Sequence, residues 1–204
     1  MKITKITQQV KQRDRYSIFV DGKYSFSLSE TALLESKLAS GQELSREQVD
    51  EYKQLSADDK LYNRALRYVA MRSRSVGEIR EYLRRKDSPA PLIEQITNKL
   101  VRLGLLDDYK FAEAFVRDRR LLRSASTRKL RLELQKKHVP SDIIDRVLAE
   151  DETDEAALLR ELIIKKRRQA KYRDDDLKLM QFLARQGFNY GAIKDALAAV
   201  DESS

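Results

Sequence analysis

The sequence lacks several residues on which common functional classes depend. It has no cysteine, which excludes disulfide bonds and thiolate metal ligands, and no tryptophan. Its single histidine, His138, leaves no second candidate for histidine-assisted proton transfer. Only three prolines and six glycines occur in 204 residues, and 36% of the residues are charged, a composition that favours helices. No apolar run has the length of a membrane span, so we expect a soluble cytoplasmic protein without a membrane partner.

Residues that could support catalysis or hold a metal ion are few. Asp107-Asp108 and Asp174–Asp176 could ligate magnesium, but both groups come directly before helical patterns, where carboxylates cap backbone N–H groups. No glycine-rich phosphate loop of the Walker type is present. We interpret His138 as a helix stop rather than a base. The sequence therefore predicts a protein that is not an enzyme and that uses no cofactor or metal.

A segment of 23 residues occurs three times without gaps, from Ser75 to Thr97, from Ser126 to Leu148 and from Asp175 to Leu197. Each copy begins with a residue type that caps helix N-termini. Apolar residues recur at the fifth, ninth and nineteenth positions: Ile79, Leu130 and Leu179; Leu83, Leu134 and Leu183; Ile93, Ile144 and Ile193. A fixed period with retained apolar positions predicts tandem structural repeats that bury part of their surface against one another.

Each copy is predicted to hold the second and third helices of a three-helix repeat, with the first helices starting near Leu61, Asp108 and Glu155. The stretch Lys129–Gln135 alternates as a strand would, but its alignment with the other copies predicts a helix. A residue that can adopt a left-handed conformation is expected where each second helix stops. The residues at that position are Asp87, His138 and Gly187.

The first part of the chain has a different pattern. Apolar residues alternate on both sides of Asp21-Gly22, which predicts a β-hairpin closed by a type I′ turn, and Lys2–Gln9 is a plausible third strand. Two short helices are expected next, with Ser29 and Ser45 as N-caps. The predicted fold is mainly α: three tandem three-helix repeats in a curved array, preceded by a small N-terminal β-hairpin/α module. The predicted domains are 1–56 for the module and 57–106, 107–150 and 151–204 for the repeats.

Positive charge is concentrated in the first two repeats. Residues 61–150 carry 21 Lys and Arg against 12 Asp and Glu, whereas residues 1–60 are neutral and residues 151–204 have a net charge of −1. Such a basic stripe suits a polyanion, although charged helix faces are more often simply solvated. The candidate binding residues for a filament or nucleic acid are Arg72, Arg74, Arg84, Arg85, Lys86, Arg117, Arg119, Arg120, Arg123, Lys136 and Lys137.

Helical spacing gives a more detailed expectation for this surface. Arg117, Arg120 and Arg123 are three residues apart and are expected to project from one side of their helix, with Leu122 on the apolar side. Cations of the net acidic third repeat are expected to matter less for binding. Those cations are Lys165, Arg167 and Arg168.

The segment GLLDDYKFAEAFVRDRR, Gly104–Arg120, resembles the hallmark of the RecX regulators of bacterial recombination. The hairpin, the Arg-Ser-x-x-Glu entry at Arg74 and the three tandem repeats are similar to that family over nearly the whole chain. The resemblance implies a non-enzymatic, monomeric regulator in DNA repair and the SOS response. It would bind the groove of the RecA nucleoprotein filament and inhibit or modulate its ATPase, strand exchange and recombination activity.

The alternative is a DNA-binding protein of helix-turn-helix-like repeats. Base readout requires Arg, Lys, Asn or Gln near the start of the recognition helix. The three candidate helices are mainly apolar or acidic there, so any contact with single- or double-stranded DNA is expected to be weak and independent of sequence.

Overall fold

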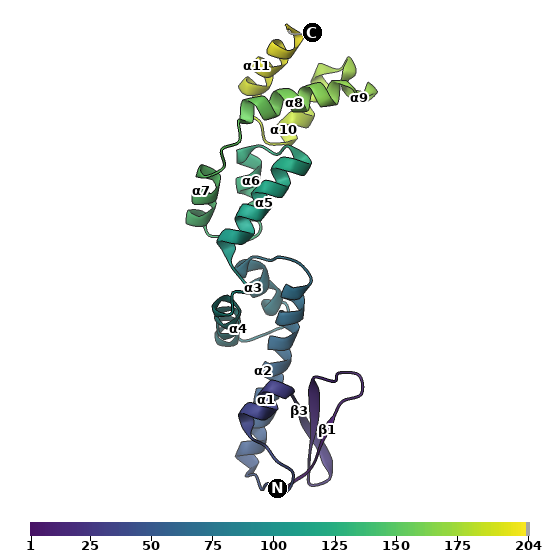
Figure 1. Ribbon diagram of the computed structural model, residues 1–204, viewed down its shortest axis with the longest axis vertical. Coiled ribbons are helices and arrows are strands. Elements are labelled where there is room, and N and C mark those ends of the chain that lie inside the picture. Colours follow the sequence, from purple (N-terminus) through teal and green to yellow (C-terminus); the bar gives the residue numbers. More distant parts are fainter. Residues whose placement is uncertain (203–204) are drawn as a thin grey trace. The chain divides into compact units, whose positions relative to one another are not determined.

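The computed structural model describes residues 1–202 and divides them into two compact units. The first unit contains Met1–Arg72 and Ile79–Leu103, and the second contains Ser73–Glu78 and the chain from Gly104 onward. Figure 1 shows that helices make up most of the chain and that the strands are confined to its N-terminal part. The predicted mainly helical fold with a small N-terminal sheet is confirmed.

The first unit begins with an antiparallel sheet in the order β1-β2-β3. Its strands are β1 (Ile3–Gln8), β2 (Arg15–Val20) and β3 (Lys23–Ser29). Asp21 and Gly22 connect β2 to β3 with φ values of 48° and 78°, the two positive values that a type I′ turn requires. The predicted hairpin and third strand are thus confirmed. Ile3, Ile18 and Leu28 are completely buried in the core of this unit.

Two helices follow the sheet, α1 (Glu30–Ser36) and α2 (Arg46–Ala70), with Ser29 and Ser45 as the predicted N-caps. The expectation that the chain breaks between a short helix and the first repeat is wrong, because α2 is continuous over 25 residues. The connecting residues 56–60 contain neither proline nor glycine, so nothing ends the helix there. The boundary predicted between residues 56 and 57 falls within α2.

Polar contacts attach the middle of α2 to the sheet. The Arg15 guanidinium lies 2.8 Å from an Asp59 carboxylate oxygen, and both side chains are buried. The same carboxylate accepts hydrogen bonds from the backbone N–H and the hydroxyl of Ser29, at 2.9 and 2.6 Å. Because this buried ion pair is also hydrogen-bonded, its charges are compensated. The sheet and the helix are therefore parts of one packed body.

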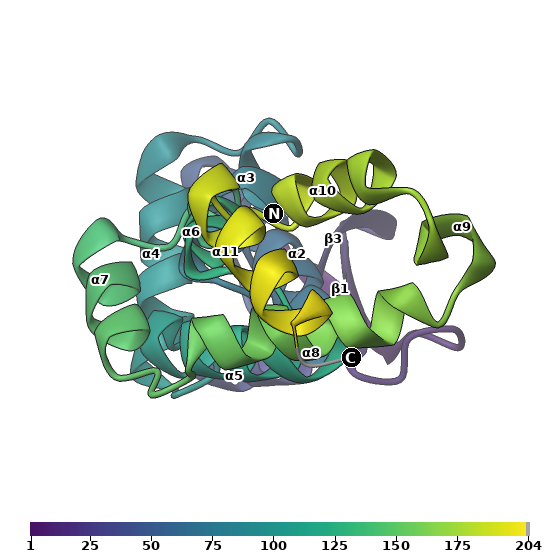
Figure 2. The same ribbon diagram turned by 90° about the horizontal axis from the view of Figure 1, so that it is seen from above.

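The remaining helices form the repeats. In the first repeat they are α3 (Val76–Arg84) and α4 (Ala90–Arg102); in the second, α5 (Asp108–Arg123), α6 (Thr127–Gln135) and α7 (Ser141–Ala149); in the third, α8 (Glu155–Arg167), α9 (Ala170–Arg173), α10 (Asp176–Arg185) and α11 (Tyr190–Asp201). The stretch that alternates like a strand is helix α6, as the alignment predicts. The third repeat has an additional short helix, α9, between α8 and α10 (Figure 2).

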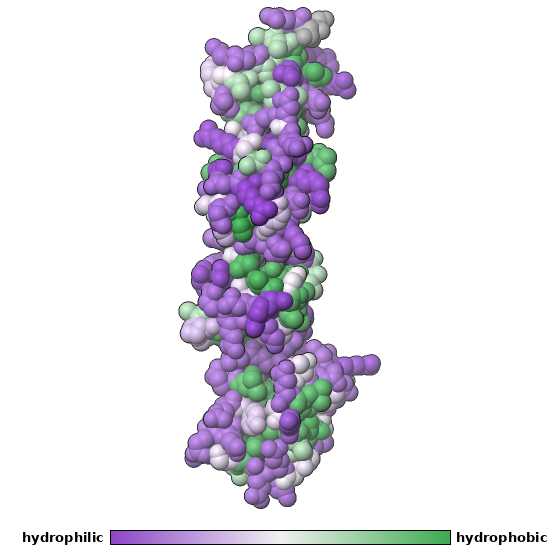
Figure 3. Space-filling view, turned by 60° about the vertical axis from the view of Figure 1, so that its left-hand side comes forward, coloured by the Kyte–Doolittle hydropathy of each residue, from purple (hydrophilic) through white to green (hydrophobic). Residues whose placement is uncertain are grey.

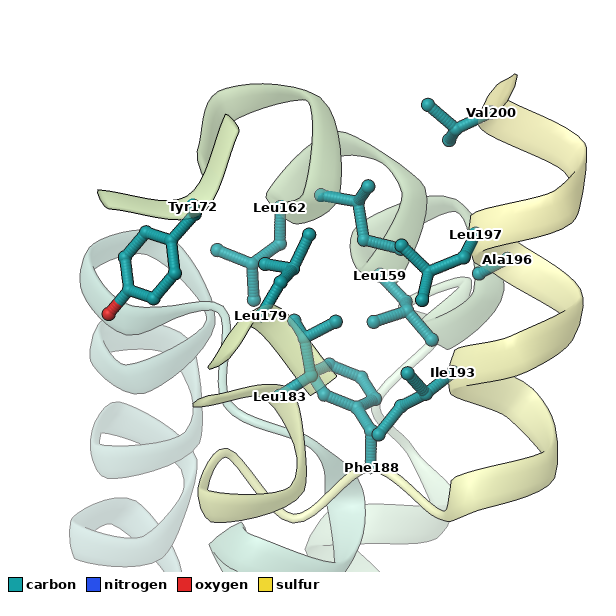
Figure 4. Packing of buried hydrophobic residues seen from close by; sticks show 11 residues of the cluster. Leu159, Leu162, Tyr172, Leu179, Leu183, Phe188, Ile193, Ala196, Leu197 and Val200 are labelled. Carbon is teal, nitrogen blue, oxygen red and sulfur yellow. The ribbon is translucent and has the colours of Figure 1, made fainter. Parts of the chain in front are cut away.

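The repeated apolar positions form the cores of the repeats. All nine residues predicted from the fifth, ninth and nineteenth positions are at most 4% exposed. In the third repeat, Leu159 and Leu162 of α8 meet Leu179 and Leu183 of α10 (Figure 4). Ile193 of α11 closes the same cluster. The predicted equivalence of the three copies is confirmed at these positions.

The helix stops also recur as predicted. Asp87, His138 and Gly187 have φ values of 54°, 57° and 92°, so all three are left-handed. In each case the next residue donates its backbone N–H to the carbonyl five residues earlier, which satisfies a free carbonyl at the helix end.

The start of each of the first two copies contacts the helix stop of the next copy. In what we call the first joint, the Ser75 hydroxyl donates to the Lys137 carbonyl and the Val76 N–H donates to Asp108 at 2.8 Å. In the second joint, the Ser126 N–H donates to the Gln186 carbonyl at 3.1 Å and the Thr127 N–H donates to Glu155 at 2.8 Å. The partners occupy corresponding positions in their repeats, so both joints are built on one plan.

A polar pair closes each joint. Lys137 lies 2.9 Å from the Glu78 carboxylate in the first joint, and Lys129 donates to the Gln186 amide oxygen at 2.8 Å in the second. Glycine permits the close approach in both. A Cβ on Gly77 would overlap His138, and a Cβ on Gly187 would overlap the Ser126 hydroxyl. Both joints therefore depend on a close approach that a residue with a Cβ would obstruct.

We predict that Leu134→Ala destabilises the protein by about 2–5 kcal/mol, because it removes burial and leaves a cavity. Leu132→Ala on the same helix is the matched control, since Leu132 is 49% exposed and Leu134 is completely buried. Equal denaturant midpoints for the two variants would contradict the repeat alignment.

We also predict that Gly77→Ala destabilises the protein by about 1–3 kcal/mol through overpacking against the His138 backbone, although alanine favours a helix. Arg128→Ala, at the matching position of the next copy, should change the unfolding free energy by less than about 0.5 kcal/mol. Thermal melts of both variants measure the difference. A stabilising Gly77→Ala substitution would show that the first joint does not form.

Candidate polyanion-binding surface

The structure separates the eleven predicted cations into two groups. Seven are exposed: Arg72, Arg84, Arg85, Lys86, Arg117, Arg123 and Lys136. The other four are buried or half-buried: Arg74, Arg119, Arg120 and Lys137. Burial gives the four a role within the fold, and the other seven lie at the protein surface.

Arg120 connects the end of the second repeat to the beginning of the third. Its guanidinium lies 2.7 Å from Asp151 and donates to the Ala125 carbonyl at 2.7 Å and the Thr127 hydroxyl at 2.8 Å. The expectation that Arg120 projects beside Arg117 and Arg123 is wrong. It lies four residues after Val116 and continues the buried face of α5, so it points inward.

Leu122 is also placed differently from the expectation. It is 78% exposed rather than part of the apolar side of α5. It lies in the last turn of the helix, where it lines a surface pocket together with Leu162 of α8. The three-residue spacing of the arginines therefore does not divide this helix into a basic and an apolar side.

Asp151 is the ionised partner of Arg120. Burial opposes ionisation of this carboxyl, but hydrogen bonds from Thr153 and Arg120 outweigh that effect and hold its pKa below the usual value. Stability from a lowered carboxyl pKa is present above the unfolded pKa of about 4 and is lost as the pH falls through the folded pKa. The Arg120 ion pair therefore contributes at neutral pH and weakens in acid.

Two further predicted cations are compensated by acids. Arg119 lies 2.7 Å from Glu133 of α6 and over the ring of Phe115 at 4.6 Å, and Lys137 pairs with Glu78 in the first joint. Arg74 is 7% exposed. Each side chain thus has neighbours within the protein that account for its position.

Some of the exposed cations have partners within the described part of the protein, and others form no ion pair there. Arg84 lies 3.3 Å from Glu81 and Lys86 lies over the Tyr82 ring at 5.8 Å. Arg117, Arg123 and Lys136 form no ion pair with the acids of residues 1–202. On the face shown in Figure 3, hydrophilic residues surround small hydrophobic patches. Polar side chains therefore make up most of this face.

Sequence reasoning missed three lysines that lie close to Arg123. Lys129, Lys165 and Lys166 line the same pocket as Arg123 and Leu122, at the second joint. Lys165 belongs to the third repeat, for which a lesser role was expected. Arg167 of the same helix instead pairs with Asp176 at 2.7 Å. The contact between the start of α6 and the end of α10, which brings Lys129 to this pocket, is visible only in the structure.

The aspartate groups considered as magnesium ligands have structural roles. Asp107 is the N-cap of α5 and accepts from the N–H groups of Tyr109 and Lys110, and Asp175 is the N-cap of α10. Asp108 accepts from Val76 in the first joint. Within residues 1–202, no three His, Asp or Glu side chains come together as a metal site would require.

None of the helices within residues 1–202 is both long enough and apolar enough to span a membrane.

The fold and this surface define a class of protein: tandem three-helix repeats with basic residues on their surface, preceded by a three-stranded sheet. Three family models match the chain: the Regulatory protein RecX N-terminal domain at residues 1–45, the RecX first three-helix domain at 62–100 and the RecX second three-helix domain at 107–148.

Full-length relatives agree with these matches. Regulatory protein RecX of Halalkalibacterium halodurans is 33% identical over 97% of this chain and 77% of that protein. Regulatory protein RecX of Lacticaseibacillus casei is 32% identical over 98% of this chain and 77% of its own length. A crystal structure of regulatory protein RecX superposes with a TM-score of 0.75 and 30% identity, covering 95% of this chain and 98% of that one. The chain belongs to the RecX family of regulatory proteins.

We predict that Arg120→Ala costs about 3 kcal/mol of stability, because it leaves the Asp151 carboxylate without its buried partner. Arg117→Ala is the control on the same helix and should change the unfolding free energy by less than about 0.5 kcal/mol. Denaturant unfolding at neutral pH measures both. Similar values for the two variants would mean that the Arg120 contacts contribute little to the fold.

Proposed function

We propose that this chain is a non-enzymatic regulator that binds the groove of the RecA nucleoprotein filament and inhibits or modulates its ATPase and strand exchange. The observation that carries this proposal is membership of the RecX family over nearly the whole chain. A filament of this kind contains nucleic acid, so its groove presents negative charge to a basic protein. The proposed partner also places the protein in the cytoplasm, where bacterial DNA lies.

The proposed contact residues are the exposed cations of the first two repeats. They are Arg72, Arg84, Arg85, Lys86, Arg117, Arg123 and Lys136. We exclude Arg120 from direct contact, because its guanidinium already has protein partners on all sides. Arg74, Arg119 and Lys137 are assigned to maintaining the repeats.

Regulation requires a difference in affinity between filament states. A ligand shifts a conformational equilibrium only to the extent that it binds one state more tightly than the other. A monomer that prefers one arrangement of neighbouring RecA subunits would hold that arrangement. This would oppose the subunit rearrangements that accompany ATP hydrolysis and strand exchange.

Base-specific DNA binding has little support from the third helices α4, α7 and α11. The first turn of each contains no Lys or Arg, and α7 has Asp142 there. A recognition helix needs hydrogen-bonding side chains near this end. Contact with DNA is therefore proposed to involve phosphates and to be independent of sequence.

Binding to three targets tests the proposal: free RecA, free single-stranded DNA and the assembled filament. We expect the filament to be bound more tightly than either component, and filament ATP hydrolysis to be inhibited. Equal affinity for free DNA and the filament, without inhibition, would instead support a plain DNA-binding protein.

We predict that Arg85→Glu combined with Arg117→Glu weakens filament binding by about tenfold or more, because two phosphate-facing charges are reversed. Arg160→Glu combined with Lys194→Glu changes the net charge equally at exposed positions of the third repeat and is the control. Both variants should keep the wild-type circular dichroism. If the control loses as much affinity as the first variant, the loss follows from net charge and not from the positions of Arg85 and Arg117.

A further inference from the structure

Positive charge gathers in a pocket at the second joint, although part of this pocket comes from the net acidic third repeat. The pocket has a volume of about 260 Å³ and is lined by Leu122, Arg123, Ser124, Lys129, Leu162, Lys165, Lys166, Phe182 and Gln186. Four of these residues are cations and none is acidic. Leu162, which is fixed in the core of the third repeat (Figure 4), forms part of the wall.

No carboxylate within residues 1–202 pairs with any of the four cations. Lys129 donates to the neutral Gln186 amide, and Lys166 lies over the Phe182 ring at 4.7 Å. Arg123 and Lys165 are exposed. The lining side chains therefore bring four positive charges to the pocket without compensating them.

Corresponding positions of the first joint have the opposite balance. There the residues are Glu78, Asp118, Arg119, Glu133 and Lys137, with a net charge of −1, and Arg119 and Lys137 pair with Glu133 and Glu78. At the second joint the same positions hold Lys129, Lys165, Lys166, Phe182 and Gln186, with a net charge of +3. Two joints whose contacts involve corresponding residues thus differ by four charges, so the joint itself does not require a basic lining.

Helix dipoles do not account for this excess. Arg123 lies in the last turn of α5, and Lys165 and Lys166 lie in the last turn of α8, where cations interact favourably with the helix C-terminus. Each C-terminus carries the equivalent of roughly −0.5 charge, so two helix ends offset about one of the four positive charges. The remaining positive charge faces the solvent side of the pocket, where an anion can approach it.

We propose that this pocket binds the phosphodiester backbone of single-stranded nucleic acid. The lining brings four cations and no carboxylate to one place, and this charge is complementary to a phosphate backbone. Three of the four cations are lysines, which bind phosphate as point charges, and the fourth is an arginine, whose planar fork also matches phosphate. The inference deepens the proposed function and rests on it for the source of the strand, which is the DNA of the filament.

The site also assigns a direct role to the third repeat. Lys165 and Lys166 come from α8, Phe182 from α10, and Arg123 and Lys129 from the second repeat. The complete pocket therefore exists only when the second joint is formed. Binding of the strand should in turn favour the formed joint.

The test uses Lys129→Glu combined with Lys165→Asp, which introduces the residue types found at the matching positions of the first joint. Glu at position 129 can form a capping box with the N-cap Ser126, as Glu78 does with Ser75, so this variant should fold. Lys129→Arg combined with Lys165→Arg retains the charge. Arg160→Glu combined with Lys194→Glu makes the same change in net charge away from the pocket.

The full-length variants are titrated with fluorescent oligothymidylate without RecA, at several salt concentrations. A protein that makes six to ten phosphate contacts loses about 10³–10⁵ in affinity between 50 and 200 mM salt, which is roughly threefold for each contact. The pocket variant, which loses two contacts, should therefore bind about tenfold more weakly. For a single strand, each phosphate contact contributes about 0.7 to the slope of log affinity against log salt concentration. Loss of two contacts in the pocket variant should therefore reduce this slope by roughly 1.4. The arginine variant should bind as the wild type does, and the distant variant should change by less than about threefold.

Unchanged oligonucleotide binding by the pocket variant overturns the proposal, as does an equal loss in the distant variant. Competition by polyglutamate as effective as that by oligothymidylate would also overturn it, and would identify an acidic protein as the occupant. Inhibition of RecA filament ATPase is measured separately on the same proteins. If the wild type binds oligothymidylate through the pocket but does not inhibit the filament, the proposed function fails while the phosphate site stands.

Discussion

The repeats depend on a helix start that contacts a helix end. Every helix leaves unpaired N–H groups at its start and unpaired carbonyls at its end. In both joints these groups bond to partners in the next repeat: the start of one second helix contacts the carbonyl near the end of another, and an acidic side chain of the next first helix accepts from the following N–H. The contact brings two backbones together, so a glycine is needed on one side. Gly77 supplies it at the helix start of the first joint, and Gly187 at the helix end of the second.

Each joint is held by a few hydrogen bonds at corresponding positions, and the side chains around these bonds differ between the two joints. The first joint carries acid–base pairs such as Arg119–Glu133, while the second carries unpaired lysines at corresponding places. The cations that maintain the fold and those that face solvent consequently occur side by side in the sequence. Arg119 and Arg120 are held by acids, whereas Arg117 and Arg123 on the same helix are exposed.

Much of the fold could be predicted because the sequence contains three copies of one pattern, and each copy helps to interpret the other two. The alignment identified α6 as a helix against its local alternation, and it located three left-handed stops at Asp87, His138 and Gly187. The site was less predictable, since burial of an arginine depends on its acid partner, and Asp151 lies 31 residues beyond Arg120. The net charge of a stretch of sequence also adds together residues that lie on different sides of the protein. It therefore concealed Lys165, whose repeat is acidic elsewhere.

The continuity of α2 joins what the sequence suggested were two separate modules. This helix packs against both β3 and α4, and Asp59 near its middle pairs with Arg15 of the sheet. A helix of 25 residues at 1.5 Å per residue extends about 37 Å, and neither half has a stop signal that would let it end alone. The N-terminal sheet and the α2–α4 packing should therefore melt in one cooperative transition, with a folding nucleus that includes residues on both sides of position 56.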